Sequence, residues 1–120
     1  MFLTFKSIDN EGNEIKFQTE YEKLDNKYIF DDLSVENTKV ELMMNDENVI
    51  INRFGDTESK FVFIQGVDTL AYYKNSLGLE LKMNILTKKI TIKSKQLYLE
   101  YDLILDFDVI SSHKIWILFH

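Results

Sequence analysis

Residues 53–87 read RFGDTESKFVFIQGVDTLAYYKNSLGLELKMNILT, and the rest of the chain is organised around them. This stretch holds three of the four glycines and the densest group of aromatic residues. From Leu79 to Ile85 apolar and polar residues alternate, as they do in a strand with one buried face. The turn at residues 75–78 ends on a glycine, which tolerates a positive φ. The stretch therefore predicts an antiparallel hairpin in an all-β domain.

The other segments follow the same logic. Apolar residues alternate with polar ones at residues 14–21 and 97–105, and short polar turns separate about ten predicted strands. Ile90 has the opposite parity to Ile85, which predicts a bend or bulge between Leu86 and Lys89. We also expect turns or sharp bends at three glycines. These are Gly55, Gly66 and Gly78.

Composition limits the class of protein. The chain has 120 residues, which is enough for one domain, 1–120, with a single core. It has one alanine, while phenylalanine, tyrosine and isoleucine are plentiful, a composition that favours strands over helices. Cysteine is absent, so thiolate chemistry and disulfides are excluded. The first apolar residues reach Lys6 too early for a signal peptide, and no apolar run has the roughly 18 residues of a membrane span. We expect a soluble cytoplasmic protein.

Several features follow one another with characteristic spacing: Arg53-x-Gly55, Gly66, the segment Thr69 to Gly78, the alternating strand to Thr87, and Tyr101-x-Leu103. In this order they resemble the YwiB-like family of bacterial proteins, and the resemblance covers residues 52–105. It implies a calycin-like, that is lipocalin-like, β-barrel of about eight to ten antiparallel strands. It implies no activity, because the family has none established. Leu77 departs from the family pattern, which often has proline before the glycine of the central hairpin.

Arg53 is the main candidate for ligand binding. It shares a strand face with Val49 and Ile51, so an inward face would place its guanidinium in the barrel or at its mouth. A buried guanidinium needs a carboxylate or a bound anion. Arg53 therefore either recognises a ligand, with Tyr73 and Tyr101 as wall residues, or has no ligand. In the second case it is a surface arginine next to the Gly55 turn or forms an internal salt bridge that stabilises the fold.

A basic run at residues 87–95 offers a possible phosphate-binding surface. However, the net charge is −6, with 20 acidic and 14 basic residues, which disfavours nucleic-acid binding. Pairing in a hairpin also places Lys89 opposite Glu100 or Asp102, depending on the turn, so acidic side chains meet this face in either register. We expect no nucleic-acid partner.

Signals for metal, cofactor or catalytic sites are missing from the sequence. The two histidines, His113 and His120, have no accompanying ligand cluster. The acidic segment 9–20 has its glycine at the wrong position for a calcium loop. The nucleophile-elbow, phosphate-loop and dinucleotide motifs are absent. We predict no cofactor, no metal and no enzyme activity.

Three functions remain open from the sequence. The first is a lipocalin-like barrel that binds a small apolar, amphipathic or anionic ligand in a sizeable internal pocket. The second is a filled barrel that acts as a structural or interaction module, through an exposed patch involving Trp116 or Phe119 and with a homodimer as one form. The third is an enzyme, which would need Glu100 or Asp102 inside the barrel, against their parity. No membrane partner is expected.

Overall fold

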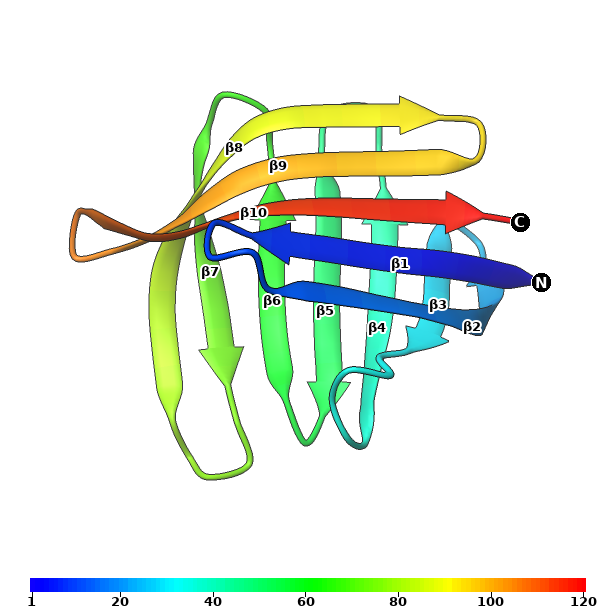
Figure 1. Ribbon diagram of the computed structural model, residues 1–120, viewed down its shortest axis with the longest axis horizontal. Coiled ribbons are helices and arrows are strands. Elements are labelled where there is room, and N and C mark those ends of the chain that lie inside the picture. The colour runs from blue at the N-terminus through cyan, green and yellow to red at the C-terminus, as the bar shows by residue number, and fades with distance from the viewer.

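The computed structural model describes all of residues 1–120 as ten β-strands without a helix (Figure 1). The strands are β1 (Phe2–Asp9), β2 (Glu14–Leu24), β3 (Lys27–Asp31), β4 (Thr38–Met44), β5 (Val49–Gly55), β6 (Glu58–Phe63), β7 (Asp68–Lys74), β8 (Glu80–Lys93), β9 (Gln96–Leu105) and β10 (Asp108–Phe119). Each pairs antiparallel with its neighbours in sequence, and β1 pairs with β10 to close the barrel. The predicted all-β antiparallel barrel is confirmed. No helix capable of spanning a bilayer is present.

The barrel is flattened into two layers that cross at a steep angle (Figure 1). Strands β1, β2, β9 and β10 run across the front of β4 to β7, while the long strand β8 contributes to both layers. The change of direction in β8 coincides with a register shift between Thr87 and Lys89, as the parity of the isoleucines predicts. Beyond this bulge Lys89 lies opposite Glu100, which is one of the two predicted registers.

The apolar part of the interior is filled with side chains. Phe5 stacks on Phe17 with 5.0 Å between ring centroids, and Phe63 meets Tyr101 edge to face at 4.8 Å. The five main recesses open on loops or rims and on an outer strand face, and none is lined by the fully buried side chains. These side chains are Leu3, Leu42, Val49, Ile51, Phe63, Ile85, Leu97, Leu99 and Ile117, with Val40 and Thr87. The sizeable internal pocket expected of a lipocalin-like binder is therefore not found in this part of the barrel.

Gly55 closes β5 under a tight steric constraint. Its φ is +124°, and an added Cβ would clash with the backbone carbonyl oxygen of Asn37. Gly66 and Gly78 also have positive φ values, +75° and +86°, but open space surrounds the position of their missing Cβ atoms. Gly55 therefore lets β5 pair closely with the start of β4, whereas the other two glycines serve turns.

We predict that Gly55→Ala lowers the free energy of unfolding by about 3 kcal/mol or more, because the methyl group must displace backbone. Gly12→Ala is the matched control, since Gly12 has a φ of +84° with nothing near its Cβ position. That change costs only the left-handed backbone conformation, about 1 kcal/mol. Urea unfolding of the two variants measures both values. Equal losses would show that the contact with Asn37 carries no cost of its own.

Candidate functional site

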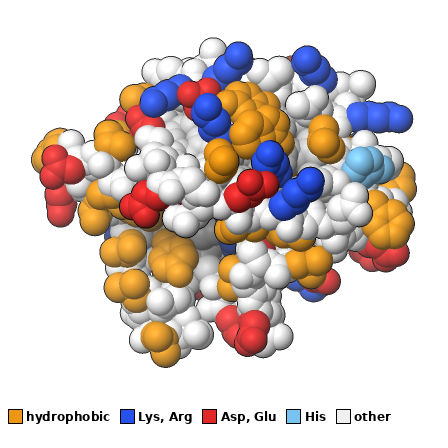
Figure 2. Space-filling view, in the orientation of Figure 1, with side chains coloured by type: hydrophobic (Ala, Val, Ile, Leu, Met, Phe, Trp, Pro, Cys, Tyr) orange, Lys and Arg blue, Asp and Glu red, His pale blue; other side chains and the backbone are white.

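The candidate site lies at the end of the barrel interior where β5 to β8 extend beyond β2. One inward-facing row crosses this end in register, from Arg53 to Ser59, Tyr73 and Leu81. We call these four residues, together with Asp32 of the β3–β4 loop, the mouth. Figure 2 shows the molecule hollowed below β2, between the β7–β8 hairpin and the β3–β4 loop. The mouth thus combines polar side chains with an opening at this end of the interior.

Arg53 faces inward because it shares the buried face of β5 with Val49 and Ile51. Its Nε donates a hydrogen bond of 3.0 Å to Oδ2 of Asp32. The Arg53 side chain is 19% exposed and that of Asp32 4%, so this ion pair is largely removed from water. No group of the protein accepts a hydrogen bond from the two terminal nitrogens of Arg53. The guanidinium is therefore anchored through Nε, and its outer edge is available.

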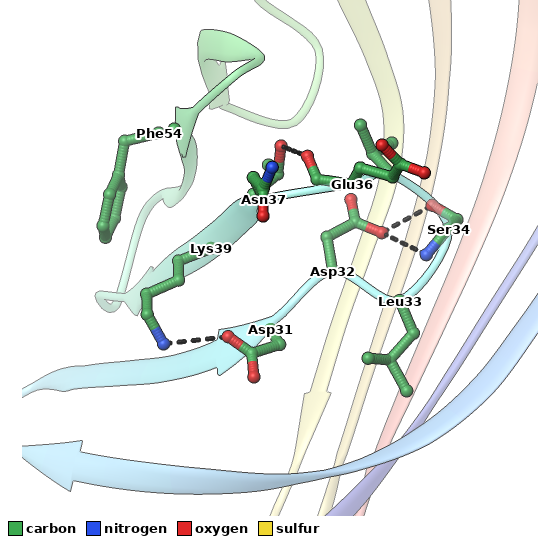
Figure 3. A pocket seen from close by; sticks show the side chains of 11 residues that line it. Asp31, Asp32, Leu33, Ser34, Glu36, Asn37, Lys39 and Phe54 are labelled. Carbon is green, nitrogen blue, oxygen red and sulfur yellow. Dashed lines mark hydrogen bonds and ion pairs between the residues drawn. The ribbon is translucent and has the colours of Figure 1, made fainter.

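The β3–β4 loop holds Asp32 in place. Oδ1 of Asp32 accepts hydrogen bonds from the backbone N–H and the hydroxyl of Ser34, as Figure 3 shows. The backbone N–H of Asp32 donates to the carbonyl of Thr38 at 2.9 Å. Both carboxylate oxygens thus have partners, which is the arrangement that a buried carboxylate requires. Sequence reasoning missed Asp32, although its spacing to Ser34 is a signal for such a turn.

The same loop borders a separate recess on the rim of the barrel, with a volume of about 660 Å³. Residues 31–39 line it together with Phe54 and Gly55, and Lys39 and Asp31 form an exposed ion pair of 2.8 Å across it (Figure 3). An exposed pair of this kind contributes little to stability or recognition. The recess has no buried polar group other than Asp32 and Thr38, which both have partners inside the loop.

Two buried hydroxyl groups of the interior have no hydrogen-bond partner. Ser59 Oγ lies on β6 directly across from Arg53, and the residue is 6% exposed. Thr87 Oγ1 lies on β8 opposite Tyr101, in a fully buried residue. Leaving such a group unpaired costs about 1–3 kcal/mol. Ser59 Oγ is therefore a buried hydroxyl without a partner on the strand next to that of Arg53.

Tyr101 lies deeper than Arg53 and Tyr73. Its ring stacks on His113 with 5.1 Å between centroids. Burial raises the pKa of Tyr101 to about 12, although the positive charge of Arg53 acts in the opposite direction. The phenol thus stays protonated at neutral pH.

All three predicted binding residues face inward, but they are not equivalent. Arg53 and Tyr73 lie two strands apart with Ser59 between them, whereas Tyr101 belongs to the packed interior. The acidic residues considered for catalysis point away from the barrel interior: Glu100 accepts a hydrogen bond from Tyr98, and Asp102 contacts Ser112 and Lys88. No group of three or more His, Asp or Glu side chains is arranged to hold a metal ion.

The fold and the mouth define a closed ten-stranded antiparallel barrel with polar side chains at the mouth. A family model described as a domain of unknown function, DUF1934, matches residues 4–117, and the chain belongs to this family. The structure is similar to the crystal structure of the ywiB protein from Bacillus subtilis, with a TM-score of 0.72 and 24% sequence identity. The match covers 97% of this chain and 87% of that one. The predicted resemblance to the YwiB-like family is confirmed. No curated protein matches the sequence.

His113 makes stability depend on pH. Burial lowers the pKa of His113 below its usual 6.5, while the negative charges of Asp9 and Asp102 act in the opposite direction. The unfolded chain therefore binds a proton at His113 at a higher pH than the folded chain does. The contribution of this residue is complete above pH 6.5 and is lost as the pH falls towards the folded-state pKa.

We predict that the free energy of unfolding falls as the pH is lowered from 7.5 to 5.5, and that His113→Gln flattens this slope. Urea unfolding at several pH values measures it. His120→Gln is the control, because the other histidine lies at the end of the chain beside Thr4. A slope that persists unchanged in His113→Gln would contradict the assignment.

Proposed function

We propose that this protein binds a small amphipathic molecule in the mouth and that Arg53 holds an anionic group of that molecule. The observation that carries the proposal is the free outer edge of the Arg53 guanidinium. Charged donors in a partly buried site form strong hydrogen bonds with carboxylate or phosphate oxygens, and a guanidinium edge suits two oxygens at once. We further propose a cytoplasmic, bacterial setting, which rests on the cysteine-free composition and the family resemblance.

The polar groups of the mouth favour an acceptor as ligand. Arg53 offers N–H groups, and the Ser59 hydroxyl on the neighbouring strand has no partner in the protein and can donate to a ligand that reaches it. The only carboxylate, Asp32, already has partners on both oxygens. A cationic ligand would therefore find no free carboxylate and would meet the positive charge of Arg53. Inward-facing apolar side chains such as Leu81 suit a short apolar body next to the anionic group.

The ion pair of Arg53 and Asp32 also serves the fold, which is the other role considered for this arginine. The two functions are compatible because Asp32 engages only Nε. Removing Arg53 alone would leave a buried carboxylate without a counter-charge, at a cost of about 3–5 kcal/mol. A test of binding therefore has to neutralise both partners together.

We predict that the double variant R53Q/D32N folds but binds decanoate about 10–100-fold more weakly than the wild type. The lost charged hydrogen bonds are worth about 1.5–3 kcal/mol. Isothermal titration with decanoate measures this, and decanol, which lacks the charge, should bind both proteins equally. Undiminished binding of decanoate by the double variant would remove Arg53 from the site. Native mass spectrometry of gently purified protein shows in addition whether a ligand co-purifies.

Ser59→Ala separates a ligand contact from a structural role. We predict that the change leaves the free energy of unfolding unchanged or slightly increases it, because it removes a buried hydroxyl without a partner. Binding of decanoate should weaken by about fivefold, since one hydrogen bond is worth about 1 kcal/mol. Chemical unfolding and titration calorimetry give the two numbers. A loss of stability with unchanged affinity would show that the hydroxyl serves the fold alone.

A second candidate function is an interaction or structural module, and the filled apolar core favours it. On the outer face of β6 to β8, Val62, Leu70 and Tyr72 line a recess of about 530 Å³ between Lys60 and Lys82. Leu70 is 75% exposed. Native mass spectrometry distinguishes this candidate, because a ligand-free dimer would favour it. The aromatic residues first considered for such a patch are occupied: Trp116 packs with Lys6 and Tyr98, and Phe119 packs with Tyr21 and Tyr28.

A further inference from the structure

Strand β2 has a free edge above the mouth. It pairs with β1 from Glu14 to Glu20, but β3 pairs with it only from Tyr21 to Leu24. Figure 1 shows the first part of β2 crossing in front of the second layer with no strand on its lower side. This edge forms the upper border of the hollow in Figure 2. An unpaired edge of this length is a template for a further strand.

The backbone groups on this edge follow from the pairing on the other side. The backbone N–H of Tyr21 donates to the carbonyl of Met1 at 3.0 Å, and only alternate residues of an antiparallel strand bond to the same neighbour. Odd-numbered residues of β2 thus bond to β1. The N–H and C=O groups of Lys16 and Gln18 point to the free edge, where the strand pairing gives them no backbone partner, while Glu20 already borders the pairing with β3.

The inward face of β2 adds apolar contacts to this edge. Ile15 is 41% exposed and Phe17 is partly buried, and both belong to the face that looks into the barrel. On the other side of the hollow, Leu79 lies just before β8 and Leu81 lies near its start. Both belong to the inward face of this strand. The hollow therefore combines backbone donors and acceptors with apolar side chains and, in the mouth, the free edge of Arg53.

We infer that the ligand is the carboxyl-terminal end of an extended peptide, which adds as a strand to β2 and places its terminal carboxylate at Arg53. This inference rests on the proposed function and deepens it. A fatty acid would use Arg53 and the apolar side chains but would leave the backbone groups of the edge to water. A peptide uses all three features, because its own N–H and C=O groups alternate at the spacing of a strand.

The shape of the hollow favours one peptide segment over a second copy of the barrel. The β7–β8 hairpin and the β3–β4 loop project on either side of it, below the level of β2 (Figures 1 and 2). A single added strand needs only about 5 Å beside β2, far less than a second barrel. Pairing β2 with β2 of another copy would bring the second layers of both molecules into the same space.

The test uses synthetic peptides and the wild-type protein in titration calorimetry. The probe is N-acetyl-Val-Leu-Val-Leu with a free carboxylate. We expect its C-terminal amide to bind at least tenfold more weakly. Two further peptides carry N-methyl groups on alternate residues, one peptide on the first set and the other on the second set. Only one set of N–H groups faces β2. One methylated peptide should therefore bind at least tenfold more weakly than the probe, and the other should keep its affinity. Equal effects of the two methylation patterns would overturn the inference.

Amide hydrogen exchange measured by NMR supplies a readout at single residues. The acid peptide should slow exchange of the Lys16 and Gln18 amides by at least tenfold, whereas decanoate should leave them unchanged. Binding of decanoate through Arg53 without peptide binding would overturn the peptide assignment and leave the proposed function intact. If decanoate and the peptide bind the R53Q/D32N variant as well as the wild type, the proposed function fails, and this inference fails with it.

Discussion

The pairing of β1 with β10 is the interaction on which the barrel depends. It runs from Leu3 opposite Phe119 to Asp9 opposite His113 and joins the two ends of the chain. All other ladders connect strands that are adjacent in sequence, so they form an open sheet on their own. Closure removes two long edges that carry apolar residues, and edges of that kind lead to aggregation. It also brings the inward residues of β1 and β10 over those of β4 to β6, which completes the core.

Closure also explains why the two ends of the interior differ. Where the two layers overlap, each inward side chain meets one from the other layer, and apolar residues exclude water completely. Where β5 to β8 extend beyond β2, no strand covers their inward face. Polar residues such as Arg53 and Ser59 occur at that end. The opening and the free edge of β2 thus have one origin, which is that β2 meets β3 only over its last four residues.

The ion pair of Arg53 and Asp32 connects the fold with the site. A largely buried ion pair is weak support for stability, because desolvation of the two charges offsets most of their attraction. The proposed external partner would give Arg53 a role besides its ion pair, because the pair lies at the mouth. Asp32 fixes the orientation of the guanidinium, since its second oxygen is held by Ser34 within the same loop.

The sequence by itself determined the strands, the turns and the parity of each side chain. The alternation of apolar residues assigns Arg53 to the same face as Ile51, and the parity change after Ile85 locates the bulge beside Thr87. These properties are local, because side chains of a strand alternate with a period of two. The family resemblance added the barrel.

Only the tertiary structure decided what faces what across the barrel. The partner of Arg53 comes from a loop 21 residues earlier in the chain, and the missing partner of Ser59 is visible only once the neighbouring strands are in place. The free edge of β2 depends on how far its pairing with β3 extends. Filling of the core likewise depends on the angle between the two layers. Spacing along one strand carries no information about such distances, because they are set by the closure of the whole sheet.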